Sequence, residues 1–315
     1  IVALLGSDFS LAYVAETTSR ATPWPYRLAA LWGGMDGSML LYATLTLVLS
    51  SVVLRRRAAV AIGGLAGIGY LLLTALAANP FNTPDIPAVD GRGLLAILQH
   101  PAMVYHPPIL YLGLSVAIVP FALTVQGIAD NRVDGSGAMP ARRWLLVAWT
   151  LLTVGMLAGA SWAYIELGWG GFWAWDPVEN TALMPWLAAT VFLHTSRIEQ
   201  RDGRLRRWNA LFAMLPFALT VLGVYLTRSG VTGSIHSFAE SPVIGVALLS
   251  ASLVALLATA VVALNARKGE PWDRVGWGRD TWLAVSAGLL AAALVFVTVR
   301  SEEHTSELQS QFRIS

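Results

Sequence analysis

Eight long apolar stretches, separated by shorter polar segments, make up most of this chain. They lie at about residues 38–54, 59–78, 109–127, 144–163, 182–196, 209–227, 242–264 and 281–299. A helix needs about 20 mostly apolar residues to cross the hydrocarbon core of a bilayer. Because 56% of the 315 residues are hydrophobic and only 13% are charged, too little polar surface exists to cover a soluble domain of this size. The pattern therefore predicts an all-α, polytopic membrane bundle of about eight transmembrane helices.

The two ends of the chain differ from the region between them. Residues 1–6 begin within an apolar run, without an initiator methionine or the charged start of a signal peptide, and we expect them to be the end of an earlier helix. Residues 300–315 are polar, have no periodic apolar face, and resemble a translated sequencing-adaptor peptide. We therefore expect one membrane domain at 1–299 and an unrelated tail at 300–315, whose His304 belongs to no site.

Arginine and lysine are distributed unequally between alternate loops. The loops that follow 38–54, 109–127, 182–196 and 242–264 hold fifteen of the 21 basic residues, whereas the loops on the other side hold four. By the positive-inside rule, the first set of loops is cytoplasmic and the second faces outward. This topology explains the net charge of +2, and no nucleic-acid partner is expected.

The outward segment 162–181 and its surroundings are rich in tryptophan. Five of the thirteen tryptophans fall within 25 residues, and they are Trp162, Trp169, Trp173, Trp175 and Trp186. Tryptophans near a bilayer boundary are usually interfacial anchors, but that explanation is weaker where three are crowded beside Gly170 and Gly171. This crowding predicts a flat apolar platform for a large planar ligand.

A carboxylate pair follows the tryptophans. Asp176 precedes Pro177 at the expected start of a helix, and Glu179 occupies the third position of its first turn. A general-acid role is one interpretation of this pair. We favour the simpler one, in which Asp176 caps the helix N-terminus.

Four histidines precede the tail. His106 and His236 lie on the same outward side as the tryptophans, and His100 lies six residues before His106. Neutral imidazole is a common ligand of haem iron, so His106 and His236 could approach a planar macrocycle from opposite faces. The alternative for both is a capping or interfacial role. His194 lies inside an apolar stretch, where an ionisable residue is a functional candidate, although a hydrogen bond to a neighbouring helix would also explain it.

Other chemistries lack a signal in the sequence. The chain has no cysteine, so any thiol must come from a partner. It also has no P-loop, no glycine-rich dinucleotide fingerprint and no recognisable Ser-His-Asp arrangement. ATP-driven activity within this polypeptide is therefore not expected.

Several motifs, in the same order, resemble the CcmF family of cytochrome c-type biogenesis proteins and its nitrite-reductase-associated paralogues. The run from Trp169 to Asp176 is similar to the WGxxWxWD signature of haem-handling membrane proteins. Further similar blocks are HPP at 106–108, DPVEN at 176–180 and RSG at 228–230. The resemblance extends from about residue 7 to at least residue 242. One departure is that Met35 and Asp36 replace the histidine and glutamate of a segment that commonly reads WGGHEGS.

The resemblance implies a set of haem-binding residues. His106 and His236 would be the axial ligands of the incoming haem on the outer face, and His194 would ligate a b-type haem in the membrane. The second b-haem ligand of the family has no counterpart before this chain ends. The haem-binding loop would comprise Trp169, Gly170, Gly171, Trp173, Trp175 and Asp176. We also predict that Arg228 pairs with a haem propionate, the alternatives being a helix cap or a contact with lipid phosphate.

The resemblance also implies a function. It is haem ligation, in which haem is positioned for thioether attachment to the CxxCH cysteines of an apocytochrome c, as by a haem lyase within a complex. The implied partners are the haem chaperone CcmE, a CcmH-type subunit, apocytochrome c and membrane lipid. The implied location is the bacterial inner membrane, with the tryptophan-rich loop facing the periplasm. The alternatives are haem delivery without ligation and solute transport, although the absence of an evident internal repeat disfavours transport.

Overall fold

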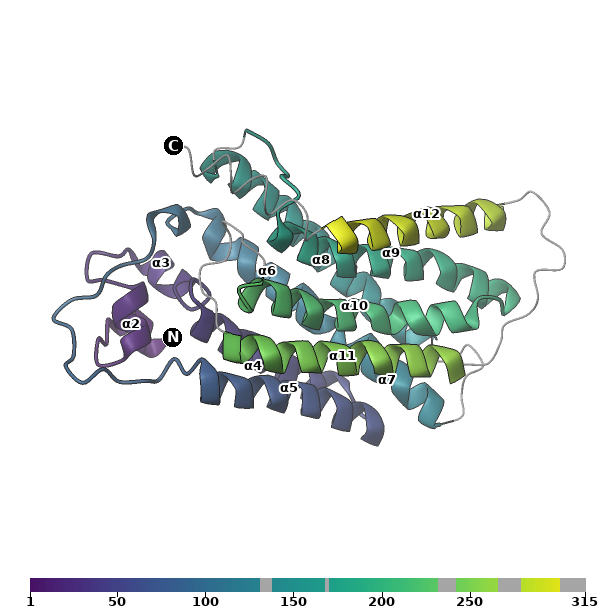
Figure 1. Cartoon of the computed structure of the whole chain (residues 1–315), viewed down its shortest axis with the longest axis horizontal. Helices are drawn as coiled ribbons and strands as arrows, with labels where there is room; N and C mark the ends of the chain where they lie inside the picture. The colour runs from purple at the N-terminus through teal and green to yellow at the C-terminus, as the bar shows by residue number, and fades with distance from the viewer. Residues whose placement is uncertain (131–137, 168–169, 232–241, 266–278, 301–315) are drawn as a thin grey trace.

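The computed structural model describes residues 1–130, 138–167, 170–231, 242–265 and 279–300 of the chain. These residues form helices joined by loops, with no strand among them (Figure 1). The predicted all-α class is therefore confirmed. The predicted tail was 300–315; Arg300 is the last residue of α12, and residues 301–315 lie outside the described residues, as do His236 and Trp169.

Long helices run back and forth along the longest dimension of the molecule (Figure 1). In the described part of the chain they are α4 (Met35–Val53), α5 (Arg57–Ala77), α6 (Ala102–Val116), α7 (Ile118–Ala129), α8 (Ala138–Glu166), α9 (Pro177–Asp202), α10 (Arg206–Arg228), α11 (Pro242–Asn265) and α12 (Arg279–Arg300). Helices α6 and α7 follow each other directly and together cross the bundle once. This alternation brings the described helix ends that adjoin the arginine-rich loops to one end of the bundle.

Among the described residues, six helical segments rather than eight are long and apolar enough to cross a membrane by length and composition. The two predicted spans that do not meet these criteria are α9 and α12. Helix α12 contributes only a shorter apolar segment, Val285–Val297. Helix α9 carries charged residues in its first and last turns, but it packs against α8, α10 and α12, so it needs no continuous apolar surface.

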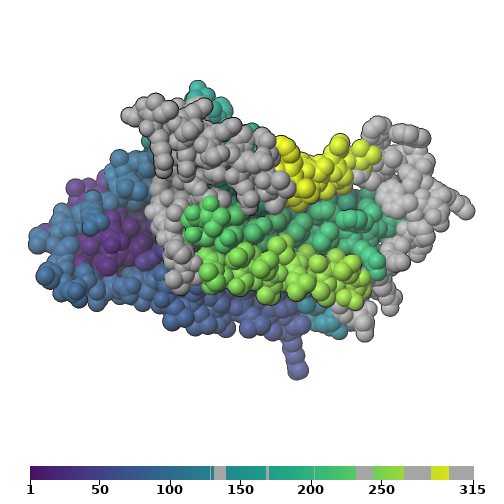
Figure 2. Space-filling view, in the orientation of Figure 1, coloured from purple at the N-terminus to yellow at the C-terminus, as the bar shows by residue number. Residues whose placement is uncertain are grey.

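Helix α10 lies at the centre of the bundle and packs against α7, α8, α9 and α11. Its apolar side chains contribute to two cores: Met214 and Phe217 pack with residues of α4 and α7, whereas Phe212 and Leu219 pack with α9 and α12. Figure 2 shows α10 and α11 as adjoining strips along one face of the molecule. Helices α5, α8 and α11 leave most of their apolar surface exposed, as expected for helices that face lipid.

Short helices close one end of the bundle, at the left of Figure 1. This N-terminal cap consists of α1 (Val2–Gly6), α2 (Ala12–Thr17), α3 (Trp24–Ala29) and the 3₁₀ turn η1 (Ala96–Leu98). Apolar side chains of the cap form a core with Trp162, near the end of α8. The Tyr13 hydroxyl donates hydrogen bonds to the carbonyl oxygens of Ala30 and Leu31, 2.8 and 3.2 Å away. These contacts fix α2 against the segment that leads into α4.

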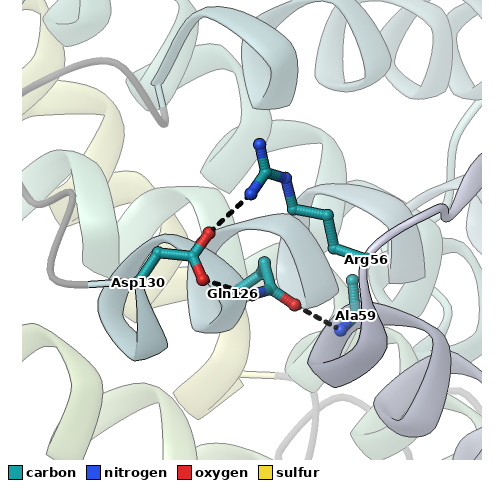
Figure 3. A network of polar contacts seen from close by, with 4 residues as sticks. All are labelled: Arg56, Ala59, Gln126 and Asp130. Carbon is teal, nitrogen blue, oxygen red and sulfur yellow. Dashed lines mark hydrogen bonds and ion pairs between the residues drawn. The ribbon is translucent and has the colours of Figure 1, made fainter.

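A polar network joins α5 to α7 at the opposite end of the bundle (Figure 3). The side-chain amide of Gln126 donates to Asp130 (2.8 Å), and its carbonyl oxygen accepts from the backbone N–H of Ala59 (3.1 Å). Arg56 completes the network through an ion pair with Asp130 (3.0 Å). Gln126 therefore satisfies an N–H group in the first turn of α5, where the helix itself offers no acceptor.

Candidate functional site

A cavity of about 180 Å³ lies inside the bundle, beneath the N-terminal cap. Its walls come from α4, α6, α8, α9 and α10 and are mostly apolar, with a few polar groups among them. A second cavity of about 60 Å³ shares His106 and Trp162 with the first and adds Trp173 and Glu179 to its wall. An apolar pocket with a few convergent polar groups is the usual form of a ligand site.

His106 is the histidine that lines both cavities. It lies on α6 beside Pro107, and its Nδ1 is 2.7 Å from the carbonyl oxygen of Gly155 on α8. Because a carbonyl oxygen can only accept, Nδ1 carries the proton in this contact and the lone pair of the neutral ring is on Nε2. Metal-ligating histidines usually donate their other ring nitrogen to such an acceptor.

Gly159 provides the space that the His106 ring occupies. A Cβ atom on residue 159 would overlap the imidazole, whose Nε2 would lie 2.8 Å from it. Gly155 and Gly159 are one helical turn apart, so the same face of α8 both holds and accommodates the ring. The position of His106 therefore depends on the backbone carbonyl of Gly155 and on the absence of a side chain at Gly159.

Arg228, the last residue of α10, extends into the larger cavity. Its Nη2 donates to the hydroxyls of Ser38 on α4 (2.9 Å) and Tyr111 on α6 (3.0 Å). Among the described residues, no carboxylate lies within 4 Å of this guanidinium. Arg228 thus joins α4 and α6 at the cavity wall. A role limited to capping its own helix, one of the predicted alternatives, does not account for these two contacts.

The tryptophan-rich loop does not present a single flat surface in its described part. The rings of Trp173 and Trp175 meet edge to face, with centroids 6.2 Å apart and planes at 84°. Trp173 lines the smaller cavity, whereas Trp175 is exposed. Gly170 turns the chain with a φ of +71°, and Gly171 follows it. The expected flat platform is therefore wrong for this pair of rings, because the loop directs them differently.

Asp176 and Glu179 act as helix-capping residues, as predicted. The buried Asp176 carboxylate accepts from the backbone N–H of Val178 at 3.0 Å. Glu179 Oε2 accepts from the N–H groups of Ala174 (2.9 Å) and Asp176 (3.2 Å), which completes a capping box at the start of α9. These bonds fix the angle at which the loop enters α9.

Trp175 has a φ of +59°, a backbone conformation that residues other than glycine rarely adopt. Asn180, which is buried in the first turns of α9, donates to its carbonyl oxygen at 3.1 Å. The loop is therefore held at Trp175 by α9, and the DPVEN block supplies both the cap and this contact.

His194 lies on α9, away from the residues that line the two cavities. Its Nδ1 is 2.8 Å from the carbonyl oxygen of Thr190, so its Nε2 carries the lone pair of the neutral ring. The Thr190 hydroxyl accepts from Trp149 on α8 (2.8 Å), and Trp149 stacks on Trp186 at 5.7 Å and 23°. The face of α9 that carries His194 is thus fixed against α8.

Three residues at the site were missed by the sequence-based prediction. Ser38, Tyr42 and Tyr111 line the larger cavity. All three place a hydroxyl inside a predicted apolar span, a signal that could have identified them. His100, in contrast, has a local role, since its Nδ1 accepts from the backbone N–H of Ala102 at 3.1 Å.

Comparisons with known proteins agree with the motifs. The family described as "Cytochrome C assembly protein" matches residues 32–234. The chain is 36% identical over 309 residues to the cytochrome c-type biogenesis protein CcmF of Escherichia coli K12, covering 94% of this chain and 47% of that protein. It is 37% identical over 304 residues to the probable cytochrome c-type biogenesis protein NrfE of the same organism, covering 93% and 55%.

A solved structure named "Cytochrome c Heme Lyase CcmF" has the same fold, with a TM-score of 0.75 and 31% identity. The match covers 95% of this chain and 46% of that one, so the chain spans about half the length of these relatives. The family expected from the sequence motifs is confirmed. This chain belongs to the cytochrome c assembly protein family.

Proposed function

We propose that the chain binds haem at the cavity beneath the N-terminal cap and holds it for attachment to apocytochrome c. One observation carries the proposal: His106 lines the apolar cavity and donates its Nδ1 proton to the carbonyl oxygen of Gly155, the arrangement usual for a metal-ligating histidine. His236 would supply the second axial ligand. The relatives named as CcmF and haem lyase support the same reaction.

The residues around His106 suit the other parts of a haem. Trp162 and Trp173 contribute aromatic rings to the cavity walls, and Arg228 contributes a cation with no carboxylate of the described residues within 4 Å. A haem propionate would pair with this guanidinium. Gly170, Gly171, Trp175 and Asp176 would act less directly, by forming and fixing the loop beside the cavity, and Trp169 remains a proposed haem-binding residue.

Haem supplies the vinyl groups to which the two thiols of an apocytochrome CxxCH motif add. The contribution of this chain would be to orient haem, because a fixed geometry converts a chance encounter into an effectively unimolecular step. The chain itself has no cysteine, so both thiols come from the apocytochrome. CcmE as the haem donor and a CcmH-type subunit as the apocytochrome carrier would complete the reaction at the periplasmic side of the inner membrane.

His194 is the proposed ligand of a second, b-type haem within the membrane. Support comes from its Nδ1 contact with the carbonyl oxygen of Thr190, which places the lone pair of the neutral ring on Nε2. The hydrogen-bonded Trp149 and Trp186 pair would keep this face of α9 in position. Loss of a low-spin b-type spectrum in His194→Ala, with outer-site binding unchanged, is the expected result.

Spectral titration with haem tests the outer site. The purified chain in nanodiscs is compared with its His106→Ala and His236→Ala variants, by absorption spectra and pyridine haemochrome. Each variant should lose one axial ligand and at least about tenfold in haem affinity, because loss of a group that only supports a metal ligand already costs about 10–100-fold. His100→Ala is the matched control, because His100 accepts a local backbone bond and should leave the spectrum unchanged. Unchanged spectra in both His106→Ala and His236→Ala would refute the proposal.

A covalent assay separates ligation from haem delivery alone. Haem-loaded chain is mixed with reduced apocytochrome c and the partner subunits, and haem that stays with cytochrome after denaturing electrophoresis is measured. Ligation predicts covalent haem that depends on His106. Haem transfer without any covalent product would favour delivery.

A further inference from the structure

An aromatic pair on the surface joins the end of α8 to the tryptophan-rich loop. The rings of Tyr164, near the end of α8, and Phe172, in the loop, are stacked with centroids 4.5 Å apart and planes at 13°. Both side chains remain exposed, Tyr164 at 50% and Phe172 at 58%. Aromatic rings contribute a large apolar area when they are covered, so this open pair is a candidate contact surface.

The pair continues an exposed face of α8. Exposed residues recur along this helix at spacings of three or four, which places them on one face. Only 22% of the most apolar part of α8 is buried inside the molecule, as expected for a helix that faces lipid. The lipid-facing surface therefore extends to Tyr164 and, through the stack, to Phe172. The exposed residues are Val147, Thr150, Val154, Leu157, Ser161 and Tyr164.

The length of α8 places Tyr164 at the depth of a membrane interface. Trp144 follows two arginines at the basic end of the bundle and lies twenty residues before Tyr164. At about 1.5 Å per residue, these two aromatic residues are about 30 Å apart along the helix, which is the thickness of the hydrocarbon core. Tryptophan and tyrosine are enriched at both membrane–water interfaces. When Trp144 lies at one interface, Tyr164 therefore lies at the other.

The arrangement of the bundle agrees with this depth. Figure 1 shows the end of α8 and the loop after it projecting above the bundle, level with the ends of α5 and α11, whereas α2 and α3 of the cap lie further out. Between residues 164 and 176 the sequence has two charged residues, Glu166 and Asp176, and Asp176 is buried in its helix cap. The described surface here presents little charge, so it suits the boundary between acyl chains and headgroups.

We propose that the stacked pair of Tyr164 and Phe172 inserts into the interface of the lipid bilayer and anchors the tryptophan-rich loop there, with phospholipid as its partner. Phe172 adjoins Trp173, which lines the smaller cavity. The anchor therefore holds one wall of that cavity at the membrane surface. The partner of the pair is lipid whatever ligand the cavity takes, so the anchor stands apart from the proposed function.

The absence of cysteine makes the depth of the loop directly measurable. Phe172→Cys is labelled with an environment-sensitive fluorophore, and the chain is placed in nanodiscs that contain phospholipid with a nitroxide near the headgroup. We expect blue-shifted emission, loss of fluorescence to the nitroxide and protection from iodide in the water. Val89→Cys is the matched control, because Val89 is also exposed and precedes Asp90, which accepts from the backbone N–H of Arg20 in the cap. Its label should be quenched by iodide and not by the nitroxide.

A label on Tyr164→Cys reports the end of α8 separately from the loop, and it should show the same quenching by lipid as the label on Phe172→Cys. If both labels behave like that of Val89→Cys, the pair lies in water and its surface is left for a protein partner. If only the label at residue 164 is quenched by lipid, α8 reaches the interface but the loop is not anchored. Either result would overturn the proposal. Circular dichroism confirms that each labelled variant is folded.

Discussion

The cavity wall around Arg228 and the network around Arg56 use arginine in opposite ways. Arg56, at the basic end of the bundle, pairs with Asp130, which in turn accepts from Gln126 (Figure 3). Arg228, beneath the N-terminal cap, contacts only neutral hydroxyls among the described residues and faces a cavity. The first arrangement includes its own carboxylate, whereas in the second no carboxylate of the described residues lies within 4 Å of the guanidinium.

This difference separates a structural polar cluster from a binding site. A polar cluster whose members satisfy one another stabilises a helix contact and requires no ligand. A half-buried cation that bonds only neutral hydroxyls among the described residues is instead costly until an anionic ligand arrives, so the protein retains it at the expense of stability. Variants at the two places should therefore affect different measurements.

The largest effect is expected for Gly159→Ala at the cavity. The new Cβ would overlap the His106 imidazole, so the ring must move and its ligating nitrogen with it. We expect a changed axial-ligand spectrum and a haem affinity lower by more than about tenfold, the usual cost of disturbing a metal ligand's support. Spectral titration measures both.

Gly64→Ala is the matched control for Gly159→Ala. Both substitutions place alanine in a helix, where it is favoured over glycine by about 1 kcal/mol. A Cβ on residue 64 meets nothing within 4 Å. If Gly159→Ala and Gly64→Ala have the same haem spectrum, His106 is not the ligand and the cavity is not the haem-binding site.

Gln126→Leu should have the next largest effect, on stability alone. It leaves the buried N–H of Ala59 without its acceptor, which costs about 1–3 kcal/mol in the free energy of unfolding. Chemical denaturation in detergent measures this loss. Haem affinity should remain at the wild-type value, and a parallel fall in affinity would contradict the separation of the two regions.

Much of the fold could be predicted from the pattern of apolar stretches, because membrane helices must satisfy their own backbone groups. The exceptions have a physical cause. Helix α9 has charged ends and fails the test of composition, yet it packs between α8, α10 and α12. A composition criterion treats every helix as if it faced lipid. It therefore rejects a helix such as α9, which is packed among other helices and needs fewer apolar residues.

The candidate site could be predicted only in part. His106 and Arg228 were found because their residue types are rare at those places, and both line the cavity. Tyr111 was missed because its hydroxyl meets Arg228 of α10, a contact that only the packing of α6 and α10 reveals. The flat platform was wrong for Trp173 and Trp175, since the direction of a loop side chain depends on backbone angles such as the positive φ of Trp175.

Asp176→Ala tests whether the carboxylate beside the tryptophans belongs to the fold or to the ligand. Loss of the N-cap should lower the free energy of unfolding by about 0.5–2 kcal/mol, whereas Asp176→Asn, which can still cap, should lower it much less. Haem affinity should be largely kept in Asp176→Asn. Near-complete loss of haem from that variant would assign Asp176 to the binding site.

Alkaline pH should weaken the N-terminal cap through Tyr13. Burial raises the pKa of the Tyr13 phenol above its usual value of 10.0, and the nearby Asp36 carboxylate raises it further. Because the folded-state pKa is the higher one, the stabilisation is complete below pH 10 and is lost as pH rises above it, by up to about 1.4 kcal/mol per pH unit. Melting temperatures between pH 8 and 11 should fall less steeply in Tyr13→Phe than in the wild type. Equal slopes would show that Tyr13 does not titrate with unfolding.

The smallest effect is expected for Asp130→Asn, at the outer edge of the Arg56 network. The Arg56 side chain is 53% exposed and that of Asp130 is 27% exposed, so solvent screens their attraction. Exposed ion pairs contribute about 0.2–1 kcal/mol, and asparagine can still accept the bond from Gln126. The difference from wild type should shrink further in high salt. A loss as large as that of Gln126→Leu would mean that the ion pair, rather than the capped N–H of Ala59, holds α5 to α7.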